Sequence, residues 1–110
     1  MDDANGKIIW VRPTTLSVDE IKDTSEKSVG FVKSGVKEET NDNGLKVIRV
    51  RETITWEMDR DYDLAYILYQ GSQQFQGKKV TYLELEIERN KVNYPVDVFN
   101  KIVSTFKFTQ

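Results

Sequence analysis

The residues of this chain whose types and spacing could do chemistry are mainly acidic, because its 110 residues include no histidine and no cysteine. That absence excludes thiolate nucleophiles, imidazole bases, disulfides and nearly all zinc or iron sites. Ser17 and Ser104 have no histidine partner, so a hydrolase triad is impossible. Carboxylate, hydroxyl, amine and backbone chemistry remain.

Three aspartates alternate at Asp59, Asp61 and Asp63, like the first oxygen ligands of a calcium loop. The match fails at two demanding positions, since Leu64 stands where the loop needs glycine and Gln70 where it needs a bidentate glutamate. We therefore expect no cofactor and favour a solvated turn. Calcium held by the three aspartates is the alternative.

Glu52 departs from the pattern of a long alternating segment in which Ile48, Val50 and Ile54 point the same way. A carboxylate among apolar neighbours would have a raised pKa and would mark a candidate site. We favour a β-bulge, or an edge of the core, that lets Glu52 reach solvent or an arginine.

Aromatic residues could line a ligand cavity beside this carboxylate. In a small-ligand carrier or enzyme of the helix-grip or cystatin-like type, Trp56, Tyr66 and Tyr82 would line a cavity between helix and sheet. Glu52 would then lie at its wall. The strand spacing of these aromatic residues also fits a packed core.

Composition limits the partners. The chain has 16 Lys and Arg against 18 Asp and Glu, a formal net charge of −2, so attraction to nucleic acid phosphates is not expected. The longest apolar stretch, 64–69, is far shorter than the ~20 residues that span a bilayer. We expect a soluble chain without a transmembrane segment.

The elements that would position these side chains begin with a helix. Ser17 and Glu20 have the spacing of a capping box, so a helix should start at Val18. Apolar residues continue at helical spacing to Val32, and Gly35 suits the left-handed position after a helix end.

Alternating segments follow, with a turn at 41–44, and predict an antiparallel sheet. We expect strands at 7–14, 36–40, from 45 onward, at 62–70 and at 80–89, with 7–14 and 62–70 central. In the last of these, Leu83, Leu85 and Ile87 face the core and the glutamates between them face water. A final helix should follow Pro95 with a broad apolar stripe.

This order predicts an α+β fold in one domain. Residues 1–6 are expected to be a disordered N-terminal segment, and 7–110 a single domain excised from a longer protein.

Three segments carry a family resemblance: IIWVR at 8–12, LSVDEI at 16–21 and FNKIVSTFKF at 99–108. They resemble PsbP-like domains, which include the photosystem II extrinsic protein of plants and small bacterial and archaeal lipoprotein or secreted domains. The resemblance covers most of the chain, and its motifs are mainly structural. It implies an α/β/α sandwich, a central antiparallel sheet flanked by helices on both faces.

The resemblance also implies a non-catalytic binding or assembly module that contacts a protein partner or a small ligand. Membership of the family would make the protein extracytoplasmic, or membrane-anchored through a missing N-terminal segment that could carry a lipid anchor. The helix-grip or cystatin-like carrier or enzyme remains the alternative.

Overall fold

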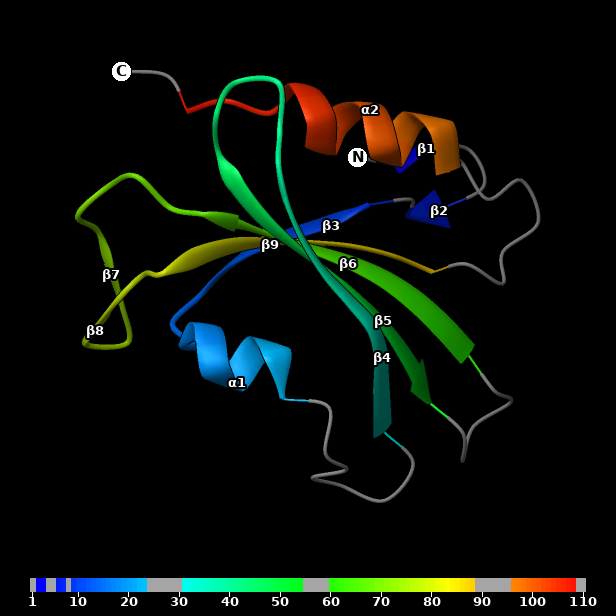
Figure 1. Cartoon of the computed structure of the whole chain (residues 1–110), viewed down its shortest axis with the longest axis horizontal. Helices are drawn as coiled ribbons and strands as arrows, with labels where there is room; N and C mark the ends of the chain where they lie inside the picture. The colour runs from blue at the N-terminus through cyan, green and yellow to red at the C-terminus, as the bar shows by residue number, and fades with distance from the viewer. Residues whose placement is uncertain are drawn as a thin grey trace.

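A five-stranded antiparallel sheet in the order β3-β9-β6-β5-β4 dominates the computed structural model (Figure 1), which describes residues 2–3, 6–7, 9–23, 31–54, 60–88 and 96–108. The strands are β3 (Trp10–Thr14), β4 (Phe31–Thr40), β5 (Lys46–Ile54), β6 (Arg60–Leu68) and β9 (Tyr82–Glu88). The predicted antiparallel sheet is confirmed, and β6 lies at its centre as expected.

Two short ladders lie outside this sheet. β1 (Asp2–Asp3) pairs with β2 (Gly6–Lys7), which crosses the boundary between the expected N-terminal segment 1–6 and the expected domain 7–110. β7 (Gln74–Phe75) pairs with β8 (Lys78–Lys79) within a stretch predicted as a loop. Gln76 and Gly77 between them both have positive φ, as in the tight turns that join twisted hairpins.

The first helix, α1 (Val18–Lys22), starts at the predicted residue. The capping box is confirmed, because Glu20 N donates to Ser17 Oγ at 3.2 Å and Ser17 N donates to Glu20 Oε1 at 2.9 Å. The predicted continuation of this helix to Val32 is wrong, since Val32 pairs with Thr53 in the β4–β5 ladder.

Gly35 has the positive φ (+61°) that the sequence suggests, but in a different structure. It lies in a break of the β4–β5 register between Ser34 and Lys37, which is a β-bulge and not a helix end. A left-handed glycine serves either structure, so the residue type alone does not distinguish them.

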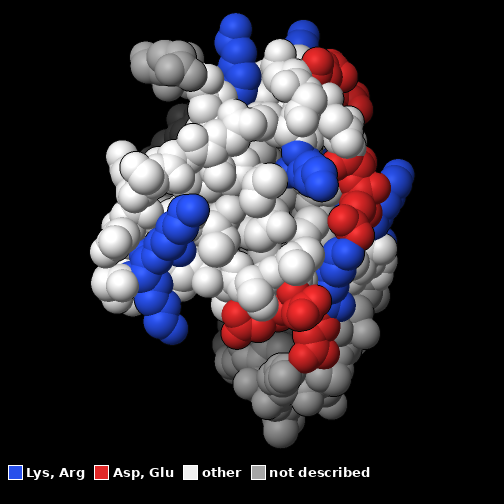
Figure 2. All heavy atoms as spheres, turned by 60° about the vertical axis from the view of Figure 1, so that its left-hand side comes forward, with Lys and Arg blue, Asp and Glu red and all other residues white. Residues whose placement is uncertain are grey.

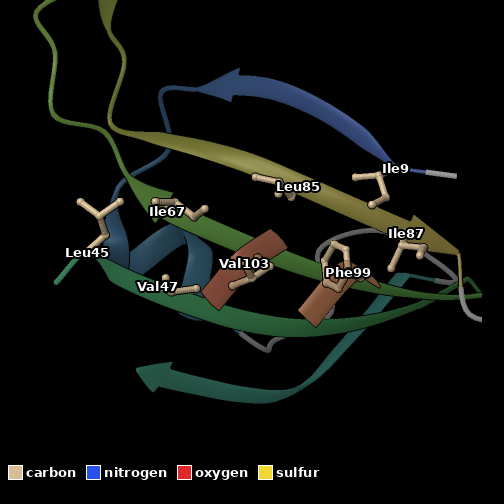
Figure 3. Packing of buried hydrophobic residues seen from close by; sticks show 9 residues of the cluster. Ile9, Leu45, Val47, Ile67, Leu85, Ile87, Phe99 and Val103 are labelled. Atoms are coloured by element: carbon tan, nitrogen blue, oxygen red, sulfur yellow. The ribbon is translucent and has the colours of Figure 1, made fainter. Parts of the chain in front are cut away.

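The second helix, α2 (Val96–Thr105), packs its apolar stripe on one face of the sheet. Phe99 and Val103 point from α2 toward strand residues such as Ile67 and Leu85 (Figure 3). The buried members of this cluster are Ile9, Leu45, Val47, Ala65, Ile67, Leu85, Ile87, Phe99 and Val103.

The opposite face holds a second buried cluster, in which Ile21 is the contribution of α1. The other members come from β5, β6 and β9: Ile48, Val50, Tyr62, Leu64, Tyr66 and Tyr82.

The predicted α/β/α sandwich is wrong: the fold is a small, sheet-dominated domain. α1 has five residues and buries one side chain, so it does not form a helical layer. Residues 31–35, which were expected to form the end of the helix, lie in the edge strand β4 instead, and the strand predicted at 36–40 is the rest of β4. Valine positions in this segment fit both the helical spacing and the alternation of a strand. Pairing with β5 supplies the ladder hydrogen bonds that favour the strand.

The first strand is also placed differently from expectation. The sequence predicts a central strand at 7–14, but β3 is an edge strand, and among the described strands it pairs with β9 alone. Val11 is 56% exposed, and Pro13, which has no backbone N–H to donate, is tolerated at an edge.

The β4–β5 turn is confirmed, and it binds the end of α2. Buried Asn41 donates from Nδ2 to the carbonyls of Val103 (3.1 Å) and Phe106 (2.9 Å). Its Oδ1 accepts from the backbone N–H groups of Asn43 (2.9 Å) and Leu45 (3.0 Å). One side chain thus shapes the turn and satisfies two carbonyls at a helix end.

Candidate functional site

Glu52 lies in β5, partly buried, on the face of the sheet that α1 contacts. Its register neighbours are Lys33 of β4 and Tyr62 of β6. Burial raises the pKa of Glu52 above its ordinary value, Lys33 opposes this, and Glu86 adds to it. The sequence therefore identifies a carboxylate with a perturbed pKa.

The bulge predicted near Glu52 lies in the neighbouring strand. The pairing of β5 with β6 runs through Glu52 without a register shift, whereas the β4 side shifts between Ser34 and Lys37. Glu52 consequently keeps the facing of Ile48 and Val50.

Two of the aromatic candidates, Tyr66 and Tyr82, are core residues that pack in one cluster with Ile21. Burial raises the pKa of Tyr66, and Glu84 and Glu52 raise it further. Trp56 lies outside the described residues, so the carrier alternative stays a prediction.

Asp61 and Asp63 lie on the α2 side of β6, and each has a polar partner in β5. Asp61 Oδ1 accepts from Thr53 Oγ1 at 2.7 Å, and Asp63 Oδ1 is 3.3 Å from Arg51 Nε. Asp59 lies outside the described residues. Within the described part of the chain, no group of three or more acidic residues could hold a metal ion, and the calcium alternative stays a prediction.

The glutamates of β9 are less exposed than the alternation predicts. Glu84 and Glu86 both pair with Arg12 of β3, at 3.1 Å for Arg12 Nε to Glu84 Oε2. Burial raises the pKa of Glu84, and Arg12 opposes this. Glu84, Glu86 and Glu52 share one face of the sheet. The carboxylates of Glu84 and Glu86 already have a cationic partner in Arg12.

A groove of about 470 Å³ opens on the other face of the sheet, beside the bulge of β4. We call it the bulge groove and define it by its lining residues: Gly35, Lys37, Glu39, Arg49, Val50, Arg51, Asp63, Leu64 and Asn100. It brings charged side chains from three adjacent strands together with one amide from α2.

Arg49 is held from three sides in this groove. Its Nη2 donates to Asn100 Oδ1 at 2.7 Å, and its Nη1 lies 3.4 Å from Glu39 Oε2. Its Cζ also lies 5.5 Å from the ring centroid of Phe99, within the range of a cation–π contact. Arg49 is therefore fixed in one orientation by strand and helix together.

Arg51 and Lys37 are more open. Arg51 uses Nε to contact Asp63, and its side chain remains 48% exposed. Lys37 is exposed, and among the described residues it has no ion-pair partner. Within the described residues, the groove therefore contains one fixed guanidinium, one half-exposed guanidinium and one ammonium without an ion pair.

The bulge groove is not predicted from the sequence. A detectable signal is the Arg49-x-Arg51 spacing, which places two guanidiniums on one face of a strand. Lys37 could not be added to them, because its position depends on the bulge at Gly35, which the sequence assigns to a helix end.

The outer surface carries no large field of one sign on the face shown in Figure 2. Basic and acidic side chains form small separate groups around a broad area of other residues, consistent with the nearly balanced composition. In the described part of the chain, no helix is long and apolar enough to cross a membrane.

No family model, curated protein or solved structure matches this chain. The resemblance to PsbP-like domains therefore stays a prediction, and function has to be argued from the chain's own side chains.

Proposed function

We propose that this chain is a non-catalytic binding module that holds a small charged molecule in the bulge groove. The observation that carries the proposal is the groove itself, whose volume of about 470 Å³ lies within the usual range for small-molecule sites. Its lining combines three cations, two carboxylates and an amide. Such groups recognise a charged ligand and fix its orientation.

The fixed orientation of Arg49 in the groove supports recognition of a ligand. Arg49 is positioned by Glu39, Asn100 and the ring of Phe99 before any ligand arrives. A donor that is already ordered loses less conformational entropy on binding than a free surface arginine does.

The chemistry of the lining favours binding over catalysis. The chain has no histidine, which is the side chain that most often acts as general base, and no cysteine nucleophile. The two lining carboxylates each contact a guanidinium. Their role in the proposed module is to orient the arginines.

The experiment is a titration of ¹⁵N-labelled full-length chain with small anions, cations and neutral polar compounds at constant ionic strength. We expect at least one class to shift the backbone amides of residues 35–37 and 49–51 saturably. Arg51→Gln should weaken that response, whereas Lys107→Gln, which removes an exposed cation outside the groove lining, should not. Absence of saturable shifts, or shifts equal in Arg51→Gln, would overturn the proposal.

We also propose, on the sequence resemblance alone, that the module is related to PsbP-like domains and works outside the cytoplasm. The sandwich implied by that resemblance is not the architecture found, so the support is the three sequence segments. Fractionation of cells that express the native gene tests the location, and recovery of the protein in the cytoplasm would refute it.

A further inference from the structure

The bulge in β4 decides which side chains share the groove. The β4–β5 register pairs Ser34 with Arg51 and Lys37 with Arg49, so Gly35 and Val36 are accommodated opposite a single β5 residue. An extra residue in one strand redirects the side chains next to it. Here both Lys37 and Arg51 line the same cavity.

Gly35 contributes space as well as backbone geometry. A Cβ at this position would lie 4.0 Å from the Cβ of Arg51, which is ordinary van der Waals contact. Without that carbon, Gly35 adds no side-chain atom to the groove lining next to the Cβ of Arg51.

Three donors of the groove lining have no partner among the residues that the structure describes. Arg51 contacts Asp63 through Nε alone, which leaves its two Nη groups for a ligand. Asn100 accepts from Arg49 through Oδ1, so its Nδ2 is still a donor. Lys37 adds an ammonium that is not engaged in an ion pair within the described residues.

The charges of the lining have one imbalance. Arg49 and Glu39 form one pair, and Arg51 and Asp63 form another, so the positive charge in excess is that of Lys37. The complement of this arrangement is an anion with acceptor oxygens, because all three available groups donate and none accepts.

We propose that the bulge groove binds an oxyanion, a carboxylate or a phosphate group, between the Nη groups of Arg51, the Nζ of Lys37 and the Nδ2 of Asn100. This inference rests on the proposed function and specifies its ligand. Arg51 supplies the flat fork that matches two oxygens, and Lys37 supplies a mobile point charge.

The test is a titration of the ¹⁵N-labelled full-length chain with citrate and, separately, with inorganic phosphate, at constant ionic strength maintained with sodium chloride. We expect saturable shifts at residues 35–37, 49–51 and 100. Both Arg51→Gln and Lys37→Gln should weaken binding about tenfold, the effect of losing one charge-assisted hydrogen bond. Lys107→Gln should bind as the parent does.

Response to citrate alone identifies a carboxylate ligand, response to phosphate alone identifies a phosphoryl ligand, and response to both supports a general oxyanion site. If neither anion gives saturable shifts at millimolar concentration, or if both variants bind as tightly as the parent, the oxyanion inference is overturned. A cation that still fills the groove saturably would leave the proposed function standing. Lys37→Gln serves as a second variant because its exposed side chain has no ion pair to lose among the described residues.

Discussion

Replacing Asn41 by alanine should strongly destabilise the fold, although Asn41 lies in a turn. Its side chain is 7% exposed and makes four hydrogen bonds, two within the turn and two to carbonyls at the end of α2. The bonds to Val103 O and Leu45 N are buried, and the other two are partly buried.

The cost follows from these environments. A buried polar group left without a partner costs about 1–3 kcal/mol, and a bond whose groups can still reach water contributes about 0.5–1 kcal/mol. Two bonds of each kind give about 3–8 kcal/mol of unfolding free energy lost in Asn41→Ala. A domain of this size has about 5–15 kcal/mol in total, so the loss is a large share.

Urea unfolding followed by circular dichroism measures this loss. Asn43→Ala is the matched control, because Asn43 also donates to the end of α2, at Thr105 O (2.9 Å) and Phe106 O (3.1 Å), but from an exposed position. The loss of these two exposed bonds should cost about 1–2 kcal/mol. Equal losses in the two variants, or a loss below about 1 kcal/mol in Asn41→Ala, would refute the reasoning.

Asn41→Asp separates the donor role from the acceptor role. The carboxylate keeps the acceptors for the turn but turns oxygens toward two helix carbonyls. We expect it to be less stable than Asn41→Ala at neutral pH and to recover as the pH falls, because the protonated acid can donate one bond. A pH-independent difference between the two variants would contradict this explanation.

Three further predictions concern the sheet and α2. Glu52→Gln should stabilise the chain at pH 7, because the raised pKa of Glu52 in the folded state penalises its ionised form. The gain in unfolding free energy should vanish below the ordinary pKa of 4.5, where the carboxyl group is protonated in both the folded and the unfolded chain. Urea unfolding at pH 4 and at pH 7 measures this gain, and an equal gain at the two pH values would count against burial as the cause. Phe99→Ala should cost about 3–5 kcal/mol, whereas Val98→Ala, at a 48% exposed position of the same helix, should cost about 0.5 kcal/mol or less, as calorimetry can check. Gly35→Ala should cost about 1–2 kcal/mol of unfolding free energy, because alanine is strained at the positive φ of this position and its Cβ would meet no atom closer than 4.0 Å. A thermal melt that shows stabilisation by this substitution would exclude the left-handed conformation at residue 35.

Local signals predicted local structure well. The spacing of Ser17 and Glu20 predicted both the capping box and the start of α1. The alternation of β9 and the turn at 41–44 were also predicted without tertiary information. The capping box and the turn depend on interactions within a few residues, and the pattern of β9 is visible within one strand although its partners are remote in sequence.

Predictions failed where tertiary pairing decides. Val32 fits a helical face and a strand equally, and pairing with Thr53 of β5 selects the strand. The same ambiguity hid the bulge groove, since Gly35 was assigned to a helix end and Lys37 could not be placed beside Arg51. Glu52 was located because it breaks an alternation that is visible in one strand.

The edge position of β3 affects the order in which the strands of the sheet pair during folding. β4, β5 and β6 are joined in chain order and can pair by closing short loops, whereas Arg12 of β3 meets Glu84 of β9 across 72 residues. Loop closure over that distance costs more entropy than a hairpin does, and β3 has one neighbour to compensate for it. The strand that begins the sheet in sequence is therefore the one best suited to join last and to detach first, which leaves β9 as a temporary edge.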